Sequence, residues 1–432
     1  MKAALSFKDS RTGFSKGGYN AMNIKTEKLY SSIKDGICVY NGVIDLISDI
    51  LRSSSQNVSI INNRVILDYN KKDFSYDELR SQFNPKFKYV EHQIRALSEM
   101  LKRTNGIIKA TTSAGKSEIF IAFLKLTKIK TLISVPKVNL ANQTRERIIS
   151  ENLDCGIVTG ACKKYSNENI CVSTPQMALS TLTDGFDCVI IDECHHVCSQ
   201  TLQDFLKQTT AKAIYGFSAT PDTNKIDFLK IRQFCGKIIV DIGAQELIDN
   251  DVIVRPEISF IPISQPKTLS WPAANDVCII NNIDRNDKIK ELAENSEQPV
   301  LVLIRNIEHG KYLNSIINNS IFLSGSDDVE YRSEVFKKFE SKELPVLIGT
   351  IGILSEGISI NSIRTLIVAQ GGKSDIITVQ SIGRALRRDG KEKTKAIVYD
   401  FYDYGNKFTE SHSNQRAAMY KKTGFKVNSL IS

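Results

Sequence analysis

Short apolar segments rich in β-branched residues alternate with helical stretches from Gln93 onward. This alternation predicts βαβ units, whose strands pair in parallel. The strands expected in a first sheet are 106–110, 131–135, 170–173, 188–192 and 213–218. The strands expected in a second sheet are 253–261, 300–304, 321–323, 346–349, 365–369 and 396–401. We therefore expect an α/β protein with two similar parallel-sheet lobes in tandem, preceded by a small α+β domain.

The length of 432 residues is sufficient for more than one domain. We expect a basic N-terminal α+β domain that binds nucleic acid (1–85) and a first lobe (86–248). A second lobe (249–405) and a basic C-terminal tail (406–432) are expected to follow. The tail could lie along DNA, but its apolar residues Phe425 and Val427 favour docking on the second lobe. The proline-containing stretch 265–282 is expected to be a surface connection between the lobes. Trp271, the only tryptophan, is expected to pack against its own domain.

Composition excludes several classes of protein. Hydrophobic residues make up 41% of the chain and charged residues 24%, as in ordinary soluble proteins, and no apolar stretch is long enough to span a bilayer. The N-terminus lacks the apolar core of a signal peptide, so the nine cysteines are expected to be reduced in a cytoplasmic protein, in the host cytoplasm if a phage encodes it.

The net charge of +9 is distributed unevenly. Residues 1–88 carry a net charge of +5 and residues 384–432 carry +6, which leaves −2 for the middle of the chain. Positive charge at both ends suits contacts with a polyanion, although solvated surface lysines would give the same count.

The segment from Ala110 to Ser117 has the pattern of a phosphate-binding loop. Such a loop needs glycine where the backbone approaches the phosphates, lysine to reach their charge and a hydroxyl to hold Mg²⁺. Gly115, Lys116 and Ser117 meet these needs, with Ala110 replacing the glycine that usually begins the pattern. The preceding strand and the helix expected over 118–126 support the assignment. The expected nucleotide-binding residues of the loop are Thr112, Ser113, Ala114, Gly115, Lys116 and Ser117.

Asp192 and Glu193 follow the apolar strand 188–192 and are predicted to complete the nucleotide site. Asp192 would bind Mg²⁺ together with Ser117, and Glu193 would orient and deprotonate the attacking water. Capping of the next helix is the alternative role for this acidic pair. The adjacent cysteines and histidines at 194–198 do not suit zinc, because four neighbouring positions point mostly apart.

With Asp192-Glu193-Cys194-His195, Ser218-Ala219-Thr220 and the segment 380–387, the chain resembles the superfamily-2 helicases and translocases. The resemblance covers about 310 residues, from Tyr89 to Tyr402. Segments 111–117, 355–359 and 387–390 are similar to those of phage recombination helicases that remodel branched DNA. The resemblance implies RecA-like lobes, ATP and Mg²⁺ as cofactors, and DNA as partner.

The resemblance also implies roles for individual residues. Gln93 would recognise the adenine, Gly357 would contribute to the nucleotide site, and Arg384 and Arg387 would act as arginine fingers. His195, Ser218, Thr220 and Gln380 would couple hydrolysis to movement. Contacts to the nucleic-acid backbone are expected from Pro136, Lys137, Asn139, Thr174, Arg305, Ser324 and Thr350, each of which could instead be an ordinary turn residue.

The expected function is ATP-dependent remodelling of branched or duplex DNA by branch migration, annealing and limited unwinding, in recombination, repair or replication. Ser359 occupies a position where many relatives have Asp, which weakens the expected coupling of that loop to ATP. An RNA helicase and the motor subunit of a restriction system are the alternatives. A non-enzymatic binding module would require a broken catalytic set, and Lys116, Asp192, Glu193, Arg384 and Arg387 are all present.

Overall fold

A computed structural model of the protein describes residues 6–9, 25–28, 30–33, 36–53, 67–86, 90–221, 225–351, 361–373, 382–383, 386–388 and 393–428. The chain divides into two compact units. The first unit contains residues 1–110 and 115–241, and the second contains residues 242–432 together with the short stretch 111–114.

The first unit is built on an eight-stranded sheet with the order β12-β5-β11-β10-β6-β9-β7-β8. Its strands are β5 (Asn105–Ala110), β6 (Thr131–Ser134), β7 (Cys155–Val158), β8 (Lys163–Lys164), β9 (Ile170–Ser173), β10 (Cys188–Asp192), β11 (Ala213–Ser218) and β12 (Ile238–Ile242). The central pairings are parallel, and β8 pairs antiparallel with β7. All five strands expected from the sequence are confirmed, whereas β7, β8 and β12 were not anticipated.

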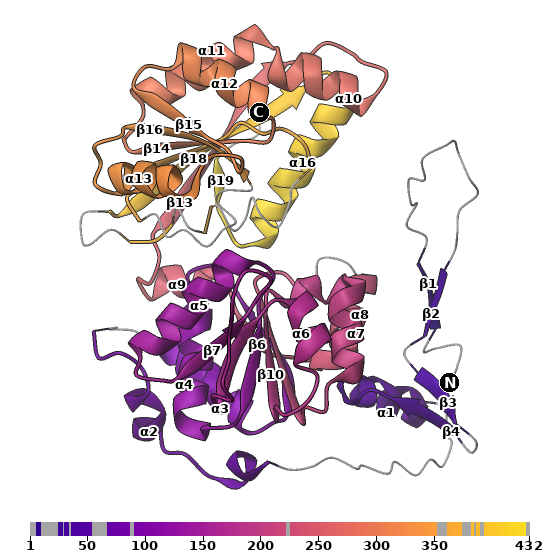
Figure 1. The fold of residues 1–432 in the computed structure, drawn as a ribbon. Helices are drawn as coiled ribbons and strands as arrows, with labels where there is room; N and C mark the ends of the chain where they lie inside the picture. The colour runs from indigo at the N-terminus through magenta and orange to yellow at the C-terminus, as the bar shows by residue number, and fades with distance from the viewer. Residues whose placement is uncertain are drawn as a thin grey trace. The chain divides into compact units, whose positions relative to one another are not determined.

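Helices cover both faces of this sheet (Figure 1). They are α2 (Tyr76–Ser81), α3 (Glu91–Leu101), α4 (Lys116–Thr127), α5 (Val138–Ser150), α6 (Pro175–Thr181), α7 (Gln200–Gln208) and α8 (Lys225–Cys235). Helix α9 (Ala244–Asp249) belongs to the second unit. Because β10 is buried from Cys188 to Ile191, its sequence is continuously apolar rather than alternating.

The N-terminal part of the first unit contains two antiparallel strand pairs and one helix. The pairs join β1 (Ser6–Asp9) to β2 (Lys25–Lys28) and β3 (Tyr30–Ile33) to β4 (Gly36–Val39). Helix α1 (Ile44–Ser53) follows, and Tyr40 packs its ring 4.8 Å from that of Phe234 on α8. Strands and a helix therefore both occur here, in agreement with the expected α+β character.

The second unit is built on a seven-stranded parallel sheet with the order β15-β16-β14-β17-β18-β13-β19. Its strands are β13 (Arg255–Ser264), β14 (Val300–Ile304), β15 (Ser320–Leu323), β16 (Val346–Thr350), β17 (Thr365–Val368), β18 (Lys395–Tyr404) and β19 (Val427–Asn428). The six strands expected from the sequence are confirmed, with ends shifted by up to three residues.

The helices of the second unit also lie on both faces of its sheet, with α11 and α12 on one face and α13 and α16 on the other (Figure 1). They are α10 (Trp271–Ala274), α11 (Ile283–Asn295), α12 (Ile307–Ile316), α13 (Val329–Glu340) and α16 (Lys407–Lys422), with a π-helical turn at Asn275–Ile280. The fold class predicted from the sequence, two RecA-like parallel-sheet lobes in tandem, is confirmed.

One expectation for the second unit was wrong. The stretch 265–282 is not a surface connection between lobes: it follows β13, lies within the second unit and buries Ala274, Cys278 and Ile279. The C-terminal segment was expected to dock on the second lobe, and within it Arg416 and Tyr420 of α16 are buried and β19 pairs with β13 of the second sheet. Among the described residues, none of the helices has the length and apolar character needed to cross a membrane.

Candidate nucleotide site

The candidate site lies at the carboxyl edge of the first sheet. Strands β5, β11 and β10 are neighbours in the sheet and run in parallel, so the loops that follow them leave from one edge. The phosphate-loop residues follow β5, Ser218 ends β11, and Asp192 ends β10. Ligands of open α/β sheets bind at this edge.

The phosphate loop has the backbone conformation that its sequence suggests. Gly115 has φ +76° and Ser113 has φ +74°, and α4 begins at Lys116. A Cβ atom added at Gly115 would lie 2.0 Å from Nε2 of Gln93, so a larger residue does not fit there. The buried side chain of Gln93, on α3, therefore lies directly against the loop. The structure thus brings together two residues that the sequence separates by more than twenty positions.

Lys116 and Glu193 form an ion pair, with Nζ 2.7 Å from Oε1. Both side chains are largely shielded, with exposed fractions of 16% and 19%. Glu193 has φ +54°, a left-handed conformation that is uncommon for residues other than glycine. Its backbone N–H donates to Oδ1 of Asp192 at 3.0 Å. The turn after β10 therefore directs Glu193 toward the phosphate-loop lysine.

The charges of this cluster support one another. Burial opposes the charge of Lys116, but Glu193 and Asp192 outweigh it and raise the pKa of the ammonium. Burial likewise opposes ionisation of Glu193, but Lys116 and His195 outweigh it and hold the pKa of that carboxyl well below its usual range. Burial raises the pKa of Asp192 to about 6, against the opposing effect of Lys116. A further cation near Asp192 would favour its ionised form.

His195 connects Glu193 to the end of β11. Its Nδ1 lies 3.0 Å from Oγ of Ser218 and 3.3 Å from Oε2 of Glu193. The backbone N–H of Thr220 donates to the same Ser218 hydroxyl at 3.2 Å. Three of the expected coupling residues thus form a chain of contacts that starts at Glu193.

The residues expected to contact nucleic acid also lie at carboxyl edges. In the first unit, Pro136, Lys137 and Asn139 follow β6, the neighbour of β10, and Thr174 follows β9, the next strand beyond β6. In the second unit, Arg305, Ser324 and Thr350 lie at or just beyond the ends of β14, β15 and β16. Lys137, Asn139 and Arg305 are exposed, whereas Thr174 and Ser324 are buried.

Some predicted residues cannot be placed. Gly357, Gln380 and Arg384 lie outside the described residues. Arg387 is described and pairs its backbone with that of Ile253 in an isolated antiparallel bridge. The roles of these residues remain predictions.

Comparisons with known protein families match both halves of the chain. Residues 86–223 match the family "Type III restriction enzyme, res subunit", and residues 284–389 match "Helicase conserved C-terminal domain". The chain is a superfamily-2 helicase. It uses ATP, and its class of enzyme is a nucleic-acid-dependent ATPase.

The helicase is similar in sequence to a phage helicase and to an archaeal translocase. It is 26% identical to the ATP-dependent DNA helicase uvsW of Enterobacteria phage T4, over 72% of this chain and 68% of the phage protein. It is 23% identical to the DNA 3'-5' translocase XPB2 of Sulfurisphaera tokodaii, over 71% of this chain and 80% of that protein.

Its fold also resembles that of S. cerevisiae Dbp5 bound to RNA and ADP BeF3. The TM-score is 0.54, the identity is 15%, and the match covers 82% of this chain and 95% of the yeast chain. This similarity supports the tandem-lobe fold of the helicase.

Proposed function

We propose that this helicase couples ATP hydrolysis to the remodelling of branched or duplex DNA, by branch migration and annealing with limited unwinding. The observation that carries the proposal is the Lys116–Glu193 pair at the carboxyl edge of the first sheet. At the same edge, just after β6 and β9, lie the first-unit residues proposed to contact nucleic acid. Similarity to a phage DNA helicase and to a DNA translocase supports DNA as the polymer.

The residues present fit a nucleotide with Mg²⁺. The left-handed Gly115 turns the loop into the N-terminus of α4, where backbone amides can face phosphates, and Lys116 supplies the positive charge. Ser117 lies in the first turn of α4, and Asp192 ends the neighbouring β10, so a hydroxyl and a carboxylate are available to hold the metal. The raised pKa of Asp192 agrees with a site that a cation completes. Bound Mg²⁺ would neutralise charge that develops on the phosphates.

The protein groups would act by positioning and by proton transfer. Lys116 would leave Glu193 to contact the terminal phosphate, and this exchange would free the Glu193 carboxylate to orient and deprotonate water. His195, in contact with both Glu193 and Ser218, would relay the change to the end of β11. Gln93 would hold the adenine, and Arg384 and Arg387 of the second unit would stabilise the transition state.

ATPase stimulation by different nucleic acids tests this proposal. The rate should be measured with single-stranded DNA, duplex DNA, a four-way junction and RNA at one salt concentration, because phosphate contacts depend strongly on salt. We expect the four-way junction to stimulate most. Stimulation by RNA alone would reject DNA remodelling and favour an RNA helicase.

A further inference from the structure

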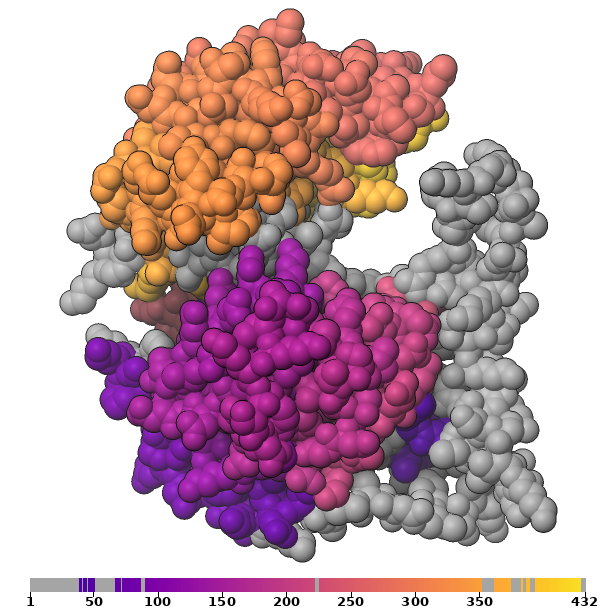
Figure 2. Space-filling view, viewed as in Figure 1, coloured from indigo at the N-terminus to yellow at the C-terminus, as the bar shows by residue number. Residues whose placement is uncertain are grey.

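The helical stretch 265–282, which follows β13, forms part of the carboxyl edge of the second sheet. It is anchored by Asn406, whose Nδ2 donates to the carbonyl of Pro266 at 2.7 Å and to Oγ1 of Thr268 at 2.9 Å. Ala274, Cys278 and Ile279 pack inward, against Phe408 of α16. On the surface of the second unit, the salmon atoms of this part of the chain adjoin the yellow atoms of the C-terminal segment (Figure 2).

This anchored stretch leaves apolar side chains in contact with solvent. Leu269 is 98% exposed, and Val277 is 44% exposed. Trp271 is half-buried: its ring centroid lies 4.3 Å from that of His412, in an edge-to-face arrangement. The contact with His412 fixes the indole and still leaves part of it accessible. The expectation that Trp271 packs against its own domain is therefore confirmed, but the packing is incomplete.

The turn beside Trp271 is fixed by two buried arginines. Arg285 donates from Nη1 to the carbonyl of Ala369 at 2.9 Å, and Arg416 donates from Nη1 to the carbonyl of Gly372 at 2.6 Å. A Cβ atom added at Gly372 would lie 3.7 Å from the Trp271 ring. Residues 369–373, the end-of-strand turn after β17, are thus held against the tryptophan.

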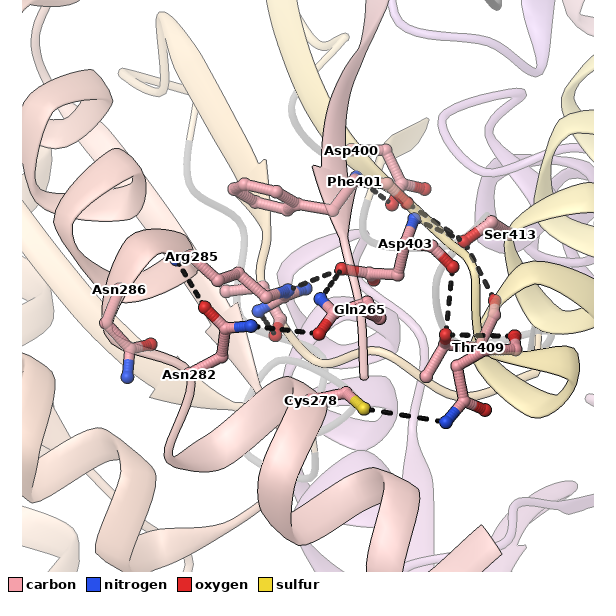
Figure 3. Close-up of polar contacts among 12 residues, drawn as sticks. Gln265, Cys278, Asn282, Arg285, Asn286, Asp400, Phe401, Asp403, Thr409 and Ser413 are labelled. Atoms are coloured by element: carbon pink, nitrogen blue, oxygen red, sulfur yellow. Dashed lines mark hydrogen bonds and ion pairs between the residues drawn. The ribbon is translucent and has the colours of Figure 1, made fainter. Parts of the chain in front are cut away.

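Each buried arginine is itself paired to a carboxylate of β18. Arg285 Nε lies 3.1 Å from Oδ1 of Asp403, and Arg416 Nε lies 3.0 Å from Oδ2 of Asp400. Gln265 donates to Asp403 at 2.7 Å and links it to Asn282 (Figure 3). The negative charges of Asp400 and Asp403 are therefore neutralised by the two arginines inside the unit. These carboxylates do not repel an anion that binds at the surface.

Two exposed cations lie at the same edge of the sheet as Trp271. Lys373 ends the braced turn, and Arg305 follows β14, the strand that pairs with β17. Burial, together with the positive charges of Lys373, Arg416 and Arg305, lowers the pKa of His412 to about 4. His412 is therefore neutral near pH 7, and its surroundings are electropositive.

We propose that Trp271, Lys373 and Arg305 form a binding site for single-stranded nucleic acid, in which a base stacks on Trp271 and the cations contact the flanking phosphates. Base stacking on a fixed aromatic ring accepts any sequence, as a translocating enzyme requires. This proposal rests on the proposed function, because it assumes that the protein acts on nucleic acid and adds that the second unit binds the single-stranded form.

Intrinsic fluorescence tests this site without any substitution, because Trp271 is the only tryptophan in the chain. Titration with an oligo(dT) strand should quench the tryptophan emission of the wild-type protein. The quenching should occur over the same concentration range as binding of a labelled strand, measured by fluorescence anisotropy. Fully paired duplex should quench much less, because its bases are already stacked. Normal anisotropy binding with unchanged tryptophan emission would overturn the site and leave the proposed function standing. An absence of DNA binding by anisotropy would instead contradict both.

Substitutions provide the second test. Trp271→Ala should weaken binding of the single strand about 5- to 150-fold, and Trp271→Phe should weaken it less. Lys373→Ala should weaken binding and reduce its salt dependence. The control is Tyr331→Ala on α13, a surface aromatic of the same unit that is 47% exposed. Equal binding by Trp271→Ala and Tyr331→Ala would overturn the site. Basal ATPase without DNA should be unchanged in the control Tyr331→Ala.

Discussion

The ammonium of Lys116 and the carboxylate of Glu193 lie 2.7 Å apart, although 77 positions separate them in the sequence. This distance joins the phosphate loop, after β5, to the acidic turn after β10. Each group stabilises the charged form of the other. This attraction outweighs the effect of burial, so the pKa of Lys116 is raised and the pKa of Glu193 is lowered. A phosphate that attracts Lys116 would therefore also change the environment of Glu193.

Lys116→Ala should abolish ATP turnover and leave nucleic-acid binding largely intact. The substitution removes the cation that contacts the phosphates, whereas the residues proposed to contact DNA follow other strands. ATPase assays and anisotropy with labelled DNA measure the two effects. Lys125→Ala, on the same helix and paired to Glu151 rather than Glu193, is the matched control and should retain activity. Full ATPase activity in Lys116→Ala would remove the assignment of the site.

Glu193→Gln should lower kcat for ATP by roughly 10²- to 10⁴-fold, as loss of a general base does. The KM for ATP should change little, because the amide leaves the phosphate loop intact and frees Lys116 from its ion pair. Asp187→Asn, just before the opposite end of β10, is the control. A variant that keeps wild-type kcat would show that Glu193 is not the base.

Arg416→Met should lower the free energy of unfolding by about 3–5 kcal/mol, because it leaves the buried carboxylate of Asp400 without its cation. Tyr420 still donates to Asp400 at 2.6 Å, which compensates only in part. Urea unfolding measures the change. Lys311→Ala breaks an exposed pair with Glu308 on α12 and should have little effect. Equal urea midpoints for the two variants would contradict the importance of the buried pair.

The stability of the protein should fall as the pH is lowered below about 6.5, in part because of His309. Burial, with a smaller contribution from Arg285, lowers the pKa of His309 to about 3 in the folded state. The unfolded chain takes up this proton near pH 6.5, so stability is lost as the pH falls between these values. The contribution is roughly 2 kcal/mol between pH 7 and pH 5. In urea unfolding at both pH values, His309→Gln should show a weaker pH dependence. The same dependence in variant and wild type would exclude His309 as the cause.

The sequence predicts the central strands of both sheets well because strands such as β10 and β14 are buried and apolar over four or five consecutive residues. β10 is an example: Cys188 to Ile191 are all buried, and the acidic pair follows directly. Strand β7 was missed because Gly156 interrupts its short apolar run, and β12 was missed because it is only partly buried and carries the exposed Asp241. The contacts of Lys116 with Glu193 and of His195 with Ser218 follow from the strand order, which brings the ends of β5, β11 and β10 together.

The buried charges of the second unit could not be predicted from the sequence. Arg416 and Arg285 count as basic residues in any charge balance, yet both are buried and paired to aspartates of β18. A local sequence pattern does not show which arginine forms a buried ion pair, because the arginine and its aspartate lie on different helices and strands. The same limitation applies to 265–282, where Pro266 and Pro272 indicated a loop although the segment is helical and packed.

Processing of a four-way DNA junction is the most direct measurement of the central claim, that ATP hydrolysis at Lys116 and Glu193 drives the remodelling of DNA. The assay follows conversion of a labelled junction to its two duplex products, with ATP, without ATP and with the Lys116→Ala variant. We predict conversion only by the wild-type protein in the presence of ATP. Equal conversion without ATP, or by Lys116→Ala, would contradict the claim.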